Sequence, residues 1–275
     1  MKFLAKWRVR KPAEDEETPY VSERYGVRTL HIGSETVQSA MRISKPLDLE
    51  LSYTRSMMGF LLFAPPPREV LMIGLGGGSL AKFVYHRLPA TRVRAVEVSP
   101  QVVAIARQYF HVPPNDARFE ILVADGAEYA TRKNVTADVL IVDGYDADAH
   151  AEELASRDFY AACRECLKEG GTLVVNLWGG DKSFATLLQR IESAFDGAVL
   201  CLPAERPGNI IVFGFRSDPG SFEWNRIDAE ARRMESELGL EFPKFVDALK
   251  KMNRHDERLL YTRSDRAINR ARGFP

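Results

Sequence analysis

Hydrophobic residues in the middle of the chain form short, continuous runs separated by amphipathic segments. The runs that predict strands are residues 70–75, 93–98, 119–124, 139–142 and 172–177. The segments with helical spacing are residues 79–88, 101–109 and 156–167, and a short helix is expected after Gly126. We expect Gly170 and Gly171 to cap the third of these helices. Strands that are apolar along their whole length and alternate with helices are typical of a parallel sheet covered on both faces.

The last part of this region follows a different pattern. A helix is expected at residues 184–195, and two strands are expected at residues 199–202 and 210–215. Seven residues lie between these two strands. A parallel connection needs roughly a dozen or more, so the pair must form an antiparallel hairpin. We therefore predict an α/β fold, a Rossmann-like, methyltransferase-type doubly wound sheet whose last strand is antiparallel.

Shorter patterned segments flank this sheet. Residues 12–19 are acidic and bounded by prolines, which predicts a solvated linker. Strand-like runs at residues 25–32 and 36–43 predict a small N-terminal β-hairpin domain. A helical pattern at residues 47–63 ends at three consecutive prolines. The organisation that these patterns predict is an N-terminal segment with a small β domain at 1–55, a catalytic core at 56–217 and a helical extension at 218–275.

Composition and charge narrow the class of protein. Lysine plus arginine and aspartate plus glutamate each number 38 among the 275 residues, so the formal net charge is zero. This balance gives no overall attraction to nucleic acid or membranes, and no segment approaches the roughly 20 apolar residues that span a bilayer. The three cysteines are too few for a disulfide framework, and Cys163 and Cys166 lie within an expected helix as packing residues. We expect a cytoplasmic protein without a metal, a nucleic-acid partner or a membrane partner.

A glycine cluster lies between the first strand and the first helix of the sheet. Gly74, Gly76 and Gly78 form a GxGxG pattern, and Ser79 stands where a dinucleotide fingerprint would have another glycine. Glycines in this context allow a tight turn and let a ligand approach the amides of the helix N-terminus. Alone, such a cluster is a weak signal.

Two acidic residues at strand ends strengthen this signal. Glu97 lies 21 positions after Gly76, at the end of the second strand, where a carboxylate can accept both ribose hydroxyls. Asp125 and Gly126 follow the third strand, where the carboxylate can accept from an adenine amino group. Each acid alone could instead be a helix N-cap. Together with the glycine turn they indicate an adenosine-bearing ligand of the S-adenosylmethionine kind.

A pair of carboxylates follows the fourth strand. Asp143 and Asp146 lie three residues apart, beside the expected ligand crevice. One carboxylate could take a proton from an amine nucleophile while the other binds a second ammonium group by charge. The alternative is that Asp143 caps a helix and Asp146 is solvated.

At this point the chain resembles a divergent member of the spermidine/spermine synthase, or polyamine aminopropyltransferase, family over residues 25–215. The resemblance rests on VLMIGLGGGSL, AVEVSP, ADGAEY and IVDGYD, on AEELASRDFY after them, and on Gln38. It implies a small N-terminal β domain before a methyltransferase-like core. It also implies transfer of the aminopropyl group of decarboxylated S-adenosylmethionine to putrescine or a longer amine. The positions it assigns are Glu97 for the ribose, Asp125 for the adenine, Asp143 as general base, Asp146 for the amine, and Gln38 and Tyr53 as lining of the cofactor and amine pocket.

The chain departs from the family pattern at several positions. Gly77 stands where the family has an aspartate that meets the aminopropyl nitrogen and would repel the carboxylate of intact S-adenosylmethionine. Arg55 stands where the family has an acid, and Ala147 follows Asp146 where proline is usual. Glu205 stands at the position of an amine-binding tyrosine, and we expect it to bind substrate. The departures therefore concentrate on the acceptor and on the tail of the cofactor.

The same residues are compatible with other functions. An S-adenosylmethionine-dependent methyltransferase on the same scaffold is favoured by Gly77 and disfavoured by Met72, where many methyltransferases have an acid. A non-catalytic paralogue that binds an adenosine metabolite is a further alternative, and Ser79 disfavours a nicotinamide dehydrogenase. We expect a small-molecule polyamine substrate and assembly as a homodimer or homotetramer.

Overall fold

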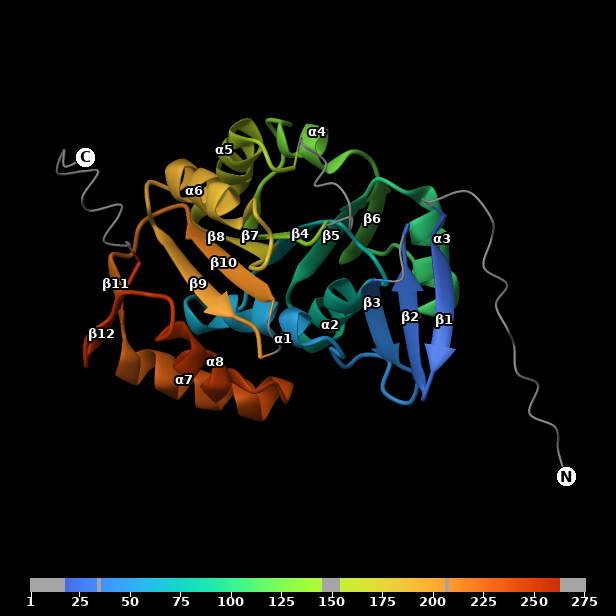
Figure 1. The fold of residues 1–275 in the computed structure, drawn as a ribbon. Helices are drawn as coiled ribbons and strands as arrows, with labels where there is room; N and C mark the ends of the chain where they lie inside the picture. The colour runs from blue at the N-terminus through green and yellow to red at the C-terminus, as the bar shows by residue number, and fades with distance from the viewer. Residues whose placement is uncertain (1–17, 34–35, 145–153, 206–207, 263–275) are drawn as a thin grey trace, which may run out of the picture.

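The computed structural model describes residues 18–33, 36–144, 154–205 and 208–262, and it is organised around a seven-stranded sheet (Figure 1). The strands lie in the order β6-β5-β4-β7-β8-β10-β9. Five neighbouring strands, β6 to β8, are parallel, and β10 is antiparallel to both β8 and β9. The predicted doubly wound sheet with an antiparallel last strand is thus confirmed. The strands are β4 Glu69–Ile73, β5 Arg92–Glu97, β6 Phe119–Val123, β7 Ala137–Val142, β8 Leu167–Trp178, β9 Val199–Pro203 and β10 Asn209–Phe215.

Helices cover both faces of this sheet, and Figure 1 shows them above and below it. One face packs against α4, α5 and α6, through a cluster that includes Leu140 of the sheet and Tyr160 of α5. The other face packs against α1, the 3-10 helix η1, α2 and the C-terminal helices, through a cluster that includes Ile141. The helices named here are α1 Ser52–Met57, η1 Met58–Leu62, α2 Ser79–Arg87, α4 Gly126–Ala130, α5 Arg157–Cys166 and α6 Phe184–Ala194. Because β4 and β7 are buried on both faces, their sequences are apolar almost throughout.

A separate antiparallel sheet of β1, β2 and β3 precedes the large one. It consists of β1 Tyr20–Arg24, β2 Val27–His31 and β3 Val37–Arg42. The strand expected from residue 25 begins later, because Tyr25 and Gly26 form a turn with φ of 52° and 74°, and β1 before it was not expected. Leu30 and Met41 of this sheet pack against Val102 of α3 Pro100–Tyr109. The small sheet is thereby held against α3, the helix that follows β5.

Gly170 and Gly171 do not cap a helix, contrary to the prediction. Helix α5 ends at Cys166 and β8 begins at Leu167. Gly170 has φ of 74°, and the pairing of β8 with β7 shifts register in this stretch. A Cβ on Gly171 would lie 2.8 Å from the Lys168 carbonyl oxygen. The two glycines therefore form a bulge within a strand, which needs the same backbone freedom as a helix cap.

The helical pattern after residue 217 corresponds to two helices, α7 Trp224–Leu238 and α8 Phe242–Leu249. A two-stranded antiparallel sheet that was not expected, β11 Ser221–Glu223 with β12 Leu259–Tyr261, brackets them. The two helices complete the core on the face that also holds α1, and each fully buried aromatic side chain there contributes roughly 1.5–3 kcal/mol. Within the described ranges no helix is long and apolar enough to cross a membrane. The two boundaries between the three predicted domains stay predictions.

Candidate active site

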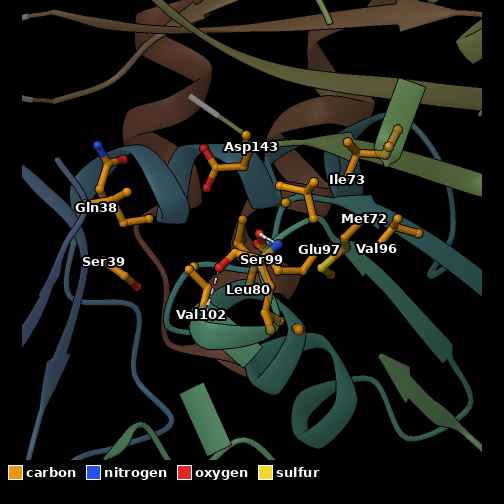
Figure 2. Close-up of a pocket in the computed structure, with 18 of the residues that line it drawn as sticks. Gln38, Ser39, Met72, Ile73, Leu80, Val96, Glu97, Ser99, Val102 and Asp143 are labelled. Atoms are coloured by element: carbon orange, nitrogen blue, oxygen red, sulfur yellow. Dashed lines mark hydrogen bonds between the residues drawn. The ribbon is translucent and has the colours of Figure 1, made fainter. Parts of the chain in front are cut away.

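A cavity of about 890 Å³ opens at the carboxyl ends of the parallel strands β4, β5, β6 and β7. Its walls also include residues of β3 and α1. Figure 2 shows Gln38 and Ser39 on one side of the cavity, Met72 and Val96 on the other, and the carboxylate of Asp143 between them. Open parallel sheets bind their ligands at this position, outside the carboxyl ends of the strands.

The glycine turn forms the floor where β4 ends. Gly74 has φ of 91°, and a Cβ there would lie 2.4 Å from the Asp143 carbonyl oxygen, so the approach of β4 to β7 requires glycine. Gly74 and Gly76 line the cavity. Gly78 instead serves the turn itself: it is the N-cap of α2 with φ of 69°, and a Cβ there would meet Val112 at 2.4 Å.

Glu97 lies at the end of β5 with its carboxylate in the cavity and 8% of the residue exposed. Its Oε2 accepts the Leu75 N–H at 2.9 Å and its Oε1 accepts the Ser99 N–H at 3.0 Å. The cap of α3 is Ser99, whose Oγ accepts the Val102 N–H at 3.2 Å. Glu97 is therefore not a helix cap, and the lone pairs that remain on its oxygens are available to hydroxyl donors.

Asp125 lines the cavity after β6 and is also the N-cap of α4, because its Oδ1 accepts the Glu128 N–H at 2.7 Å. Asp125 can therefore cap α4 and face a ligand in the cavity at the same time. Gly126 lies beside it, and a Cβ there would be 2.4 Å from Ile73 Cγ2. A larger residue at Gly126 would push the helix away from the strand that carries the glycine turn.

Asp143 follows β7, and its backbone N–H continues the sheet by donating to the Ile73 carbonyl at 3.0 Å. Its carboxylate accepts from the Tyr53 hydroxyl at 3.3 Å and from Asn176 Nδ2 at 3.1 Å. Burial raises the pKa of Asp143 to about 6, and the two hydrogen bonds act in the opposite direction. Burial and the neighbouring Asp143 raise the pKa of Tyr53 well above its ordinary value, so Tyr53 is a neutral donor. A carboxylate with this pKa suits a general base near neutral pH.

Two residues beside Asp143 were missed by the sequence reasoning. Asn176 of β8 is 6% exposed and donates to Asp143, and Asn209 at the start of β10 donates from Nδ2 to Asn176 Oδ1 at 2.9 Å. The available signal was the asparagine that interrupts the apolar run LVVNLW. A buried polar side chain in such a strand needs a hydrogen-bond partner, and here that partner is Asp143.

Gln38 and Tyr53 line the cavity as expected, from β3 and α1. The Tyr53 hydroxyl also lies 3.4 Å from the Gln38 carbonyl oxygen, which offers it a second acceptor. Gly77 packs against neighbouring side chains: a Cβ on this residue would lie 2.7 Å from Ser39 Oγ and 2.8 Å from Phe110 Cδ1. The space that an aspartate at position 77 would occupy is thus filled.

The remaining candidates for acceptor binding lie differently. Glu205 does not line the cavity; its carboxylate pairs with Lys244 at 3.3 Å and with Arg55 at 3.7 Å. Arg55 also donates to Glu241 Oε1 at 2.7 Å, at the start of α8. Asp146 lies outside the described residues. The roles assigned to Glu205 and Asp146 stay predictions.

The charged side chains in the described lining of the cavity are all acidic. Its described lining includes the three carboxylates Glu97, Asp125 and Asp143, and no lysine, arginine or histidine. Among all residues that the structure describes, no three or more histidine, cysteine, aspartate or glutamate side chains form a cluster that could hold a metal ion. A cavity of this kind favours a cationic ligand such as a sulfonium or an ammonium group.

A sheet of this strand order, with an acidic cavity at its strand ends, defines an α/β protein of the methyltransferase-like class. Residues 50–218 match the spermine/spermidine synthase domain. The chain is 42% identical over 246 residues to the polyamine aminopropyltransferase of Chromobacterium violaceum, covering 90% of this chain and 94% of that one. The corresponding protein of Neisseria meningitidis serogroup A is 42% identical over 234 residues, covering 85% and 89%. The chain belongs to the spermine/spermidine synthase family, and it is a transferase.

Solved structures share the fold at lower identity. A spermidine synthase in complex with the transition-state analogue AdoDATO has a TM-score of 0.66 at 22% identity, covering 84% of this chain and 83% of that one. A probable spermidine synthase from Corynebacterium glutamicum has a TM-score of 0.65 at 20% identity, covering 86% and 92%. Human methyltransferase-like protein 13, in complex with SAH, has a TM-score of 0.62 at 23% identity, covering 69% and 93%. These likenesses agree with the predicted methyltransferase-type fold.

Proposed function

We propose that this chain transfers an aminopropyl group from decarboxylated S-adenosylmethionine to a polyamine acceptor such as putrescine, with Asp143 as general base. The observation that carries the proposal is the acidic cavity, which ends on a buried carboxylate with a pKa of about 6. Both reactants are cations, and the described lining offers them three carboxylates and no competing basic group. The relatives named above as polyamine aminopropyltransferases support the same reaction.

The cofactor would lie along the strand ends. Glu97, fixed by two backbone amides, would accept the ribose hydroxyls, and Asp125 would accept from the adenine amino group. Gly74 and Gly76 let the ligand approach the turn without a Cβ in the way. Gln38 would contribute to the same site from the small sheet. When bound, the sulfonium supplies an electrophilic carbon beside the acceptor.

Asp143 would then handle the proton of the acceptor. The acceptor amine forms a C–N bond as the C–S bond breaks, the sulfur leaves as the neutral thioether of 5′-methylthioadenosine, and the proton passes to Asp143. Tyr53, which donates to Asp143 Oδ2, would hold the carboxylate toward the cavity and line the acceptor site. Base catalysis of this kind contributes roughly 10²–10⁴-fold, and orientation of the two reactants contributes further. Asp146 is proposed to attract the second ammonium group of the acceptor. Glu205, whose carboxylate pairs with Lys244 and Arg55 outside the cavity lining, is proposed to contribute only at longer range.

The decarboxylated form of the cofactor follows from the same charge pattern. Intact S-adenosylmethionine carries a carboxylate on the chain that reaches Asp143, and the described lining provides no basic side chain for it. Gly77 lacks the acid that would repel that carboxylate directly, so discrimination against the intact cofactor would depend on the missing cation and on Asp143. The methyltransferase alternative requires the opposite preference.

The test is a pair of measurements on the full-length protein. Calorimetry compares the affinities of decarboxylated and intact S-adenosylmethionine, and chromatography follows 5′-methylthioadenosine in the presence of putrescine. We expect tighter binding of the decarboxylated form and stoichiometric formation of 5′-methylthioadenosine and the aminopropylated amine. Tighter binding of the intact cofactor, without 5′-methylthioadenosine from putrescine or longer amines, would rule out aminopropyl transfer. Assembly as a homodimer or homotetramer, checked by analytical ultracentrifugation, and a cytoplasmic location complete the proposal.

A further inference from the structure

Two asparagine side chains form a directed series of hydrogen bonds that ends on Asp143. Asn209 Nδ2 donates to Asn176 Oδ1 at 2.9 Å, and Asn176 Nδ2 donates to Asp143 Oδ1 at 3.1 Å. The two asparagines lie on the adjacent antiparallel strands β8 and β10. Neither lines the cavity, so any effect that they have on a ligand must pass through Asp143.

The direction of this series follows from the donors and acceptors of each group. An ionised carboxylate only accepts hydrogen bonds, so Asn176 stabilises Asp143 only with its Nδ2 toward it. If the amide of Asn176 were reversed, its oxygen would face the carboxylate and the contact would become repulsive. In its observed orientation the Asn209 donor opposes the reversal, because the reversed amide would also bring two N–H groups together. Asn209 therefore favours the orientation of Asn176 in which Nδ2 meets Asp143.

The other groups that face Asp143 do not duplicate this effect. Tyr53 of α1 donates to the other carboxylate oxygen, Oδ2, and has the carbonyl oxygen of Gln38 as an alternative acceptor. The charged side chains that share the cavity are Glu97 at the end of β5 and Asp125 after β6, both acidic, and the described lining has no basic side chain. The Asn176 amide is thus the donor that holds Oδ1 while Oδ2 faces Tyr53.

We infer that Asn176 is a positioning residue for Asp143, and that Asn209 acts on Asp143 only through Asn176. The two amides keep the Asp143 carboxylate ionised and hold its Oδ1, which leaves Oδ2 on the side of Tyr53. The role of Asp143 as the base of the reaction rests on the proposed function, whereas the effect of the two amides on its ionisation does not.

The experiment measures the ionisation of Asp143 directly. The full-length protein is labelled with ¹³C at the aspartate side-chain carboxyl, and the Asp143 signal is assigned by its loss in Asp143→Asn. Its pKa is then measured in the wild type, Asn176→Leu, Asn209→Leu and the double variant, since leucine resembles asparagine in shape and cannot donate. We expect Asn176→Leu to raise the pKa of Asp143 by about one unit, the size expected for loss of a hydrogen bond to a charged group.

The double variant tests whether Asn209 acts through Asn176. Asn209→Leu should raise the pKa by about half as much in the wild-type background, and by nothing measurable in the Asn176→Leu background, because non-additivity marks a shared path. Equal shifts from Asn209→Leu in both backgrounds, or no shift from Asn176→Leu, would overturn the inference. If Asn176→Leu does not fold, Asn176→Ala takes its place, and Asn209→Leu alone must still shift the pKa.

A kinetic measurement separates this inference from the proposed function. In the aminopropyl-transfer assay, the acid limb of the kcat/KM profile should move to higher pH in Asn176→Leu by the same amount as the pKa, with unchanged affinity for 5′-methylthioadenosine. A merely structural asparagine would lower the melting temperature without moving this limb. If the wild type shows no transfer, the proposed function fails, and the ¹³C titration still decides whether Asn176 and Asn209 control Asp143.

Discussion

The two ends of the cavity are built in different ways. At the end proposed to bind the adenosyl group, called the adenosyl end and formed by Gly74, Gly76, Glu97 and Asp125, the polar side chains are held by backbone amides of the turns at the strand ends. At the proposed acceptor end, formed by Tyr53 and Asp143, the carboxylate is held by two side chains, Tyr53 in the lining and Asn176 behind it. These side chains lie 90 and 33 positions from Asp143 in the sequence.

This difference has chemical consequences. Backbone amides fix the position of Glu97 and Asp125 and leave them as stationary acceptors for a ligand. Side-chain donors around a buried carboxylate set its ionisation as well as its position, and the pKa of Asp143 is raised to about 6. The adenosyl end is thus suited to binding and the acceptor end to proton transfer.

The largest effect is expected from Asp143→Asn, which removes the base and keeps the shape of the side chain. We expect kcat for aminopropyl transfer to fall by about 10³-fold, within the range for loss of a general base. The affinity for 5′-methylthioadenosine should stay within about threefold, because the adenosyl end is untouched. Steady-state kinetics and calorimetry on the same preparation measure both quantities. Full activity in Asp143→Asn would show that the acceptor end does not supply the base.

Gly74→Ala should damage both ends together, because Gly74 is the point at which they meet. A Cβ there would lie 2.4 Å from the Asp143 carbonyl oxygen, and the residue has φ of 91°. We expect the free energy of unfolding to fall by about 3 kcal/mol, as for a clash with backbone at a strained position. Urea denaturation measures it.

The matched control for Gly74→Ala is Gly220→Ala, which also has positive φ but has nothing within 4 Å of the added Cβ. Gly220→Ala should cost only the backbone strain, about 1 kcal/mol. Equal losses in the two variants would mean that the approach of β4 to β7 is not what demands glycine at position 74.

The sequence predicted the adenosyl end better than the acceptor end for a physical reason. Gly74, Glu97 and Asp125 each lie at or just after the end of a strand, and parallel strands bring their carboxyl ends to one edge, so local pattern and topology together place them. Asn176 lies inside a strand and its role depends on which strand lies beside it. The order β7-β8-β10 that brings Asn176 and Asn209 to Asp143 is a property of the whole sheet.

The elements that the sequence missed have similar explanations. The sequence predicts a strand from residue 25, whereas Tyr25 lies in a turn. Tyrosine rarely adopts positive φ, so its residue type does not indicate a turn. The double glycine after α5 carries the same backbone signal whether it caps a helix or forms a bulge, and only the partner strand distinguishes the two. Glu205 forms ion pairs with Arg55 and Lys244. These three residues lie far apart in the sequence, so no local motif predicts their pairing.

Ionisation of Asp143 should lower the free energy of unfolding as the pH rises. The pKa of Asp143 is about 6 in the folded protein against an ordinary value of 3.8, so the folded state binds the extra proton between these values. The stability that this proton provides is present below about pH 4 and is lost as the pH rises through 6. We expect Asp143→Asn to gain about 2 kcal/mol in unfolding free energy relative to the wild type between pH 4.5 and pH 7.5.

Urea denaturation of both proteins at the two pH values isolates the contribution of Asp143. The contributions of the other titrating groups cancel when the unfolding free energy of the wild type is subtracted from that of Asp143→Asn. A difference that does not change with pH would mean that Asp143 ionises as readily in the folded chain as in the unfolded one. The base of the acceptor end would then lack the raised pKa that distinguishes it from the adenosyl end.

At the adenosyl end, Glu97→Ala should weaken binding and leave the chemistry in place. We expect the affinity for 5′-methylthioadenosine to fall about tenfold, since charged acceptors of hydroxyl groups contribute roughly 1.5–3 kcal/mol and water replaces part of it. The kcat at saturation should change by less than threefold. Glu120→Ala, which removes a carboxylate paired with Arg94 away from the cavity, is the control and should leave affinity unchanged. A loss of kcat without a loss of affinity would contradict the division between the ends.

The smallest effect is expected at Asp125, where capping and binding use the same carboxylate. Asp125→Asn keeps an oxygen that can accept from both the Glu128 N–H and the adenine amino group, and asparagine is as good an N-cap as aspartate. Its unfolding free energy should be unchanged and its affinity for 5′-methylthioadenosine reduced by less than threefold. Asp125→Ala removes both bonds and should lose about 1 kcal/mol of stability together with more affinity than the asparagine variant. If Asp125→Asn and Asp125→Ala weaken binding equally while only Asp125→Ala loses stability, ligand binding depends on the negative charge of Asp125. The adenosyl end would then use electrostatics as the acceptor end does.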